Sequence, residues 1–148
     1  MIKINKNRII IFILVAFIIL NASWFLIISV KYNKYVKDLP KFDLCSYGAK
    51  KEDGYNYHVK KPDYLHYTGN LAISNSEKGE FLIIWPLLSG GYKYSITIQD
   101  NGVSYYIYVD ENMNPVEKDD TDSSRIFQEH KASFESLLSK ANEMWQLE

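Results

Sequence analysis

Two histidines and one aspartate in the middle of the chain, His58, Asp63 and His66, have the composition of a metal site. Two imidazoles and a carboxylate form the facial triad of many iron enzymes, and the same groups could serve a hydrolase as acid and base. A tight turn at Pro62 and Asp63 would nevertheless direct the two imidazoles to opposite faces of a hairpin, because side chains alternate along a strand. A hydrolase or small-ligand-binding domain that uses these three residues is therefore our alternative hypothesis.

The other motifs that could carry chemistry are incomplete. Asp110, Asn112 and Asn114 begin like a calcium loop, but Pro115 stands where that loop requires glycine, so an ordinary turn is expected. None of the seven glycines belongs to a phosphate-binding loop. Cys45 is the only cysteine, which excludes an intrachain disulfide but leaves open a buried thiol or a disulfide to a second chain. We therefore expect no catalytic residues, no metal and no cofactor.

Composition indicates what kind of partner the chain can bind. After residue 30 there are 18 acidic and 14 basic residues, a net charge of −4, and no basic run follows the lysines at positions 31–41. Nucleic acid is therefore not an expected partner. All 12 tyrosines also follow residue 30, and tyrosine is enriched both in β-sheets and at interaction surfaces.

Residues 9–30 form an uncharged stretch of 22 residues, which as a helix would be about 33 Å long and would cross a bilayer core of about 30 Å. The apolar core of a cleaved signal peptide has only about 7–15 residues, so we predict an uncleaved transmembrane helix. Residues 1–8 form a short basic head. Residues 31–54 are predicted to prolong the helix to Leu39 and then to form an irregular stalk, and residues 55–148 to form the exposed domain.

The length of that domain predicts the orientation of the helix. Three basic residues precede the span and four occur at positions 31–41, so charge alone does not decide the orientation. A long following domain is translocated largely regardless of its charge, which places the basic head in the cytoplasm. Because abundant isoleucine, lysine and asparagine are typical of AT-rich bacterial genomes, we predict a single-pass protein of the bacterial inner membrane with its C-terminal domain in the periplasm.

Asn21 lies near the middle of the predicted span, where an amide that faces lipid would lack hydrogen-bond partners. It could contact a second helix together with Ser23, which would make the chain a homo-oligomer. It could also bond to its own helix backbone. The sequence leaves both alternatives open.

The exposed domain is predicted to combine strands with one helix. Four strands are expected at residues 55–59, 64–74, 81–88 and 92–99. A hairpin follows at Asn101 and Gly102, and residues 123–146 carry apolar side chains at helical spacing, with His130 alone among them. The predicted fold class is α+β: an N-terminal transmembrane helix, then an antiparallel β-meander of about 4–5 strands packed against a long C-terminal helix.

A two-residue turn in this hairpin would fix the faces of the sheet. It pairs Ile98 with Tyr105, Ile96 with Ile107 and Tyr94 with Val109 on one apolar face. Carried back through Gly90 and Gly91, the alternation puts Ile83, Trp85 and Leu87 on that same core face. It leaves on the far face Leu82, Ile84, Leu88, Tyr106 and Tyr108. We predict that this cluster binds a partner unless residues 41–54 cover it.

Three segments, PDYLHYTGNLAIS, the Trp85 and Pro86 pair and YVDENMNP, resemble an uncharacterised family of small single-span enterobacterial membrane proteins. The resemblance brings no activity and no site residues. From the residues themselves, the favoured hypothesis is a non-enzymatic envelope protein, held in the lipid bilayer, that presents its tyrosine-bearing sheet face to a protein partner. It would be immunity-like, binding a toxin, or an accessory of a membrane complex.

Overall fold

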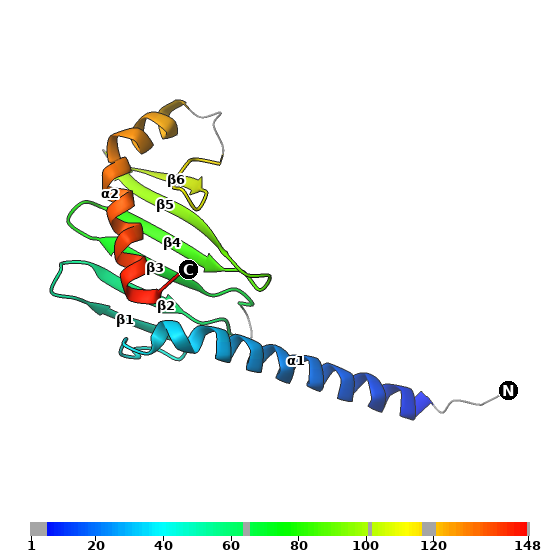
Figure 1. The fold of residues 1–148 in the computed structure, drawn as a ribbon. Coiled ribbons are helices and arrows are strands. Elements are labelled where there is room, and N and C mark those ends of the chain that lie inside the picture. The colour runs from blue at the N-terminus through cyan, green and yellow to red at the C-terminus, as the bar shows by residue number, and fades with distance from the viewer. Residues whose placement is uncertain (1–5, 64–65, 101, 117–120, 148) are drawn as a thin grey trace. The chain divides into compact units, whose positions relative to one another are not determined.

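The computed structural model describes residues 6–63, 66–100, 102–116 and 121–147, without the side chains of residues 121–123 (Figure 1). The chain divides into two compact units, Met1–Lys34 and Tyr35–Glu148. Each unit has its own internal packing.

The first unit is helical. Helix α1 spans Lys6–Val36, and its last two residues belong to the second unit. Large apolar side chains are exposed along it, among them Phe12 at 75% and Leu20 at 69%, so the helix has no single apolar stripe of the kind that packs on a soluble core. It ends at Val36, three residues before the predicted end, in a turn where the Leu39 N–H bonds to the Val36 carbonyl oxygen.

The second unit is a sheet with one helix across it, which confirms the predicted α+β class (Figure 1). The strands are β1 Ser46–Lys50, β2 Asn56–Lys60, β3 Asn70–Asn75, β4 Glu80–Pro86, β5 Tyr92–Asp100 and β6 Val103–Val109. Each pairs antiparallel with the next, so the order in space is the order in sequence. Helix α2, Thr121–Trp145, packs against β3, β4 and β6. The sheet has six strands rather than four or five.

The additional strand is β1, which lies in the segment predicted as an irregular stalk. Its sequence, SYGAK, lacks the alternation of apolar and polar residues by which a strand is recognised. It forms because it pairs with β2 along its whole length and because a bridge joins Lys41 to Tyr47 on its other side. The domain therefore begins at Tyr35, well before residue 55.

The register predicted for the last hairpin is confirmed. Ile98 pairs with Tyr105, Ile96 with Ile107, and Tyr94 with Val109. Gly102 has a φ of 80°, a conformation that favours glycine in such turns. Asn101 lies outside the described residues, so the type of the turn stays a prediction.

The face predicted for β4 is wrong. Leu82 pairs with Ile96 and Ile84 pairs with Tyr94, so Leu82 and Ile84 lie on the core face. Both are completely buried. Residues of odd number in β4, Ile83 among them, accordingly point to the other side of the sheet.

The cause is the length of the turn between β4 and β5. Leu87 and Gly91 close this turn, because the Leu87 N–H donates to the Gly91 carbonyl oxygen at 3.0 Å. Three residues lie between them. A two-residue turn would have paired odd with even residues, whereas the third residue shifts the register by one and reverses the faces. Gly90 and Gly91 make this turn possible with φ values of 95° and 74°.

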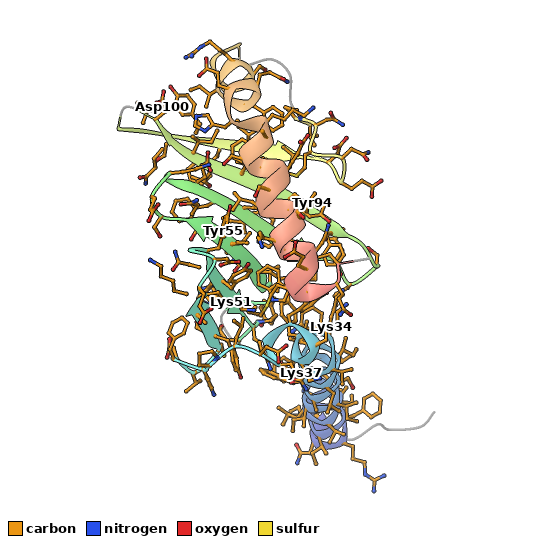
Figure 2. All side chains as sticks on the ribbon, turned by 60° about the vertical axis from the view of Figure 1, so that its left-hand side comes forward. Lys34, Lys37, Lys51, Tyr55, Tyr94 and Asp100 are labelled. Carbon is orange, nitrogen blue, oxygen red and sulfur yellow. The ribbon has the colours of Figure 1, made fainter. Side chains whose placement is uncertain are left out.

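The core lies between α2 and the sheet. From the helix, its fully or almost fully buried members are Ile126, Phe127, Phe134, Leu137, Ala141 and Trp145. Tyr94 of β5 lies beside α2, as Figure 2 shows, and is 8% exposed. At the end of α2 the indole N–H of Trp145 donates to the Tyr35 carbonyl oxygen at 3.1 Å, and the Tyr35 hydroxyl lies 3.1 Å from that of Tyr92. These bonds explain why the second unit begins at Tyr35.

Candidate functional site

The sheet face opposite α2 is covered by no helix within the described part of the unit Tyr35–Glu148. Two rows of cross-strand partners run across it. They are Ala72, Ile83, Ser95 and Tyr108 in one row and Ser74, Phe81, Thr97 and Tyr106 in the other. We call these eight residues, together with Trp85, the open face.

Aromatic and apolar side chains dominate the open face. Tyr106 and Tyr108 are 69% and 54% exposed, and Phe81, Ile83 and Trp85 are half-buried. An antiparallel sheet face that only meets water usually carries polar side chains, so this composition needs an explanation beyond solvation. Contiguous apolar and tyrosine side chains at a surface are typical of contact sites for proteins.

Two small hydroxyl side chains lie between these larger ones. Ser95 is 3% exposed and Thr97 is 7% exposed, although neither faces α2. The hydroxyl oxygen of Thr97 is buried and has no hydrogen-bond partner among the described residues. Leaving a buried hydroxyl unpaired costs about 1–3 kcal/mol. Phe81 and Tyr106 are the cross-strand neighbours of Thr97 on this face.

The cluster predicted to bind a partner is divided by the structure. Tyr106 and Tyr108 lie on the open face as expected, but Leu82 and Ile84 are core residues because the register of β4 differs by one. Leu88 is 56% exposed and lies in the turn after β4 rather than on the sheet. The open-face residues that sequence reasoning missed are Phe81, Ile83 and Trp85. The alternation in β4 would have found them, had the length of the turn been known.

The segment expected as a possible cover reaches only one end of this side of the sheet. The Phe42 ring lies 5.5 Å from the imidazole of His58, on β2. A side chain at Gly48 would meet the same Phe42 ring at 3.2 Å, so glycine at this position lets Phe42 lie against β1. Tyr106 and Tyr108, on β6 at the other edge of the sheet, remain exposed.

The possible metal ligands His58, Asp63 and His66 are not gathered into one site. Asp63 and His66 meet in the connection after β2, where the imidazole Nδ1 lies 3.0 Å from the carboxylate. His58 pairs instead with Gly48 and Ala72 in the sheet, and burial lowers its pKa. Within the described ranges there is no group of three or more side chains that could hold a metal ion. Within the described residues, the three side chains of the alternative hypothesis thus form no shared metal site.

Asp110 organises a turn at the end of β6. Its carboxylate accepts the backbone N–H of Asn114 at 2.8 Å, which is the largest cause of its lowered pKa, and that of Asn112 at 2.9 Å. Met113, within the turn, has a φ of 57° and a buried side chain. The resemblance to a calcium loop is thus accounted for by hydrogen bonds within the turn, as expected.

A buried polar cluster joins β4 to α2. Glu80 is 2% exposed, accepts a hydrogen bond from the Ser133 hydroxyl, and lies 2.8 Å from the His130 Nδ1. The sequence showed His130 on an apolar helix face but did not reveal that Glu80, two residues before Leu82, faces it. Through these two contacts the cluster holds α2 against β4.

An open cavity of about 400 Å³ lies between α2 and the connection that follows β6. Its lining is Glu111, Asn112, Met113, Glu135, Leu138, Ser139, Asn142 and Glu143. Sequence patterns could not predict it, because its two walls are separated in the chain. Three of these eight residues are acidic and none is basic, so the cavity favours cations over anions.

Asn21 and Cys45 are the residues through which the sequence could join two chains. The Asn21 amide donates to the Phe17 carbonyl oxygen at 2.8 Å, which is the own-backbone alternative. Cys45 is a half-buried free thiol. A helix contact through Asn21 and Ser23, and a disulfide through Cys45, stay predictions.

The chain gives no match to protein-family models, to curated proteins or to solved structures. Among the described residues, the aromatic and apolar side chains of the open face are not explained by packing of the core.

Proposed function

We propose that this chain is a non-enzymatic protein of the bacterial envelope, held in the inner membrane by α1, that binds a protein partner through the open face. The observation that carries the proposal is the set of aromatic and apolar side chains on the side of the sheet that α2 leaves uncovered. A toxin recognised by an immunity-like protein, or a subunit of a membrane complex, is the kind of partner that such a surface fits.

The tether is supported by α1. Among the described residues it is the one helix long and apolar enough to cross a bilayer. None of the 18 consecutive residues that form its most apolar part is buried. Signal sequences and core helices can have the same length and composition. The lack of burial along the most apolar part of α1 argues against a core helix. Its uncharged stretch of 22 residues is longer than the apolar core of a signal peptide, about 7–15 residues.

We expect the full chain to stay in the membrane fraction after alkaline carbonate extraction. Replacing Ile18 and Ile19 with arginine should release it, because each arginine at a helix centre costs about 2.5–3.5 kcal/mol of insertion free energy. Leucine at the same two positions is the matched control and should change nothing. If the chain without substitutions were recovered in the aqueous fraction, cleaved so that its first thirty residues are missing, the tether would be contradicted.

The side chains of the open face are suited to protein contact rather than to small-molecule binding. Tyrosine, tryptophan and phenylalanine offer large contact areas with few rotatable bonds and are enriched at the cores of protein interfaces. Tyr106 and Tyr108 stand at the accessible edge, with Ile83 and Phe81 behind them toward the centre of the sheet. This arrangement presents a broad apolar surface.

Site-specific photo-crosslinking in intact cells tests the proposal. A benzophenone amino acid in place of Tyr108 should capture the partner, whereas the same group in place of Gln128, exposed on α2, should not. Adding Ile83→Lys should abolish the adduct formed from position 108, because a charge would then lie within the contact. Adducts of equal yield from positions 108 and 128, or an adduct unaffected by Ile83→Lys, would refute the assignment of this face.

A further inference from the structure

We propose that two copies of this chain pair through their β6 strands, edge to edge, to form one continuous antiparallel sheet of two domains. This inference concerns the edge of the sheet rather than the open face and does not require that the open face bind a partner.

The two edges of the sheet differ in how they end. At the β1 edge, the chain covers itself: the Phe42 N–H donates to the Ser46 oxygen at 3.1 Å, and the Gly48 N–H donates to the Pro40 oxygen at 3.0 Å. Residues 40–42 therefore occupy the positions that another strand would need beside Ser46 and Gly48. The remaining outward residue of β1 is Lys50, whose charge discourages pairing, so this edge does not accept another strand.

At the β6 edge, only the end of the strand is covered. Asp100 and Val103 flank the two-residue turn, so Val103, Tyr105 and Ile107 bond to β5, while the backbone groups of Ser104 and Tyr106 point outward. The backbone groups of Tyr108 also point outward, and its carbonyl oxygen accepts a hydrogen bond from the Val116 N–H at 2.9 Å. Among the described residues, nothing bonds to the outward groups of Ser104 and Tyr106.

The stretch that no described residue covers, residues 103–107, has the sequence VSYYI and carries no charge, proline or glycine. Natural edge strands usually carry a lysine, a proline or a bulge that prevents them from pairing with other chains. None of these devices occurs here. An uncharged edge with unpaired backbone groups is a template for strand addition.

A second copy of the same stretch completes this edge. In an antiparallel pair centred on Tyr105, Ser104 of one copy lies opposite Tyr106 of the other, and Val103 lies opposite Ile107. The four hydrogen bonds of this pair satisfy every outward backbone group of Ser104 and Tyr106 in both copies. The pairs of Val103 with Ile107 and of Tyr105 with Tyr105 oppose β-branched to β-branched and aromatic to aromatic side chains, which are favourable cross-strand pairs, whereas Ser104 opposite Tyr106 adds no such gain.

The limits of the stretch favour a second copy over a longer strand from another protein. The cover at Tyr108 ends it on one side and the turn at Gly102 ends it on the other. Asp100 at the hairpin tip (Figure 2) of one copy would lie opposite Asp110 of the other, and the repulsion between these like charges limits the pair to the five residues between them. Because the β1 edge is closed, assembly stops at two copies instead of continuing as a fibre.

Disulfide trapping in membranes that contain the full chain tests this register. In a Cys45→Ser background, Tyr105→Cys should cross-link to itself under mild oxidation, because residues opposite each other at non-hydrogen-bonded positions have Cα atoms about 4.5 Å apart. Ser104→Cys and Tyr106→Cys should each fail alone and should cross-link when the two variants are co-expressed. Self-linking by all three variants, or by none, would overturn the proposal.

A backbone change separates strand pairing from chance collision. Tyr106→Pro removes an outward N–H without removing a bond to β5, so it should abolish the Tyr105→Cys cross-link while the circular dichroism spectrum stays that of the folded chain. Tyr106→Phe keeps the N–H and should leave the cross-link intact. A cross-link that survives Tyr106→Pro in the folded protein would refute pairing through β6.

Discussion

Leu82→Asp should unfold the domain, whereas the same change at the adjacent residue, Ile83→Asp, should leave it folded. Leu82 is completely buried beneath α2, so the change removes its packing, worth about 2–5 kcal/mol for a buried leucine, and buries an unpaired charge in addition. That total is comparable with the whole stability of a typical domain, about 5–15 kcal/mol. Ile83 lies on the open face, where a carboxylate can reach water.

Thermal unfolding of the full chain in detergent, followed by circular dichroism, measures this difference. Leu82→Val is the conservative control and should lower the melting temperature only slightly, because it removes one methylene group. If Ile83→Asp unfolds the domain as completely as Leu82→Asp, both faces of β4 are core and the open face is not open.

The pair formed by Glu80 and His130 should show a large coupling in a double-mutant cycle. Glu80→Ala alone should cost about 2–4 kcal/mol of unfolding free energy, because it leaves the His130 and Ser133 groups without their acceptor in a largely buried site. Once His130 is alanine, removing Glu80 should cost less, since one of its partners is already gone. We expect a coupling free energy of about 1–3 kcal/mol.

An exposed ion pair on the same helix is the matched control. Arg125 and Glu129 lie 2.9 Å apart but are 58% and 53% exposed, so solvent screens their interaction. Their coupling should be no more than about 0.5 kcal/mol. Equal coupling for the two pairs would mean that Glu80 is hydrated and does not fasten α2 to β4.

Much of the domain could be predicted from local patterns. The β5–β6 hairpin was predictable because residues of period two meet at Asn101 and Gly102, and a slip of one residue would have mixed the apolar and polar faces. Helix α2 was predictable because its apolar residues recur at helical spacing. Both signals lie within a single stretch of sequence.

The errors arise where a local pattern depends on a distant partner. Strand β1 has no apolar alternation and exists because β2 and Lys41 pair with it. The face of β4 depended on whether the turn through Gly90 and Gly91 has two or three residues, and two glycines permit either. One residue in one turn moved Leu82 and Ile84 from the predicted surface into the core.

The candidate site was predicted in part for the same reason. Tyr106 and Tyr108 belong to the hairpin whose register was secure, and the structure places them on the open face. Ile83 and Trp85 belong to the strand whose face was reversed. The buried Glu80 was not foreseeable, because its partners are 50 and 53 residues away in the sequence.

Cysteine labelling in the full chain tests most directly whether the open face is available for contact. In a Cys45→Ser background, Ile83→Cys and Ile84→Cys place a thiol on opposite faces of the same strand. In intact spheroplasts, a membrane-impermeant maleimide should label Ile83→Cys readily and should label Ile84→Cys only after the protein is unfolded. Protection of Ile83→Cys equal to that of Ile84→Cys, or labelling of Ile83→Cys only after the inner membrane is lysed, would contradict a domain that offers this face outside the cytoplasm.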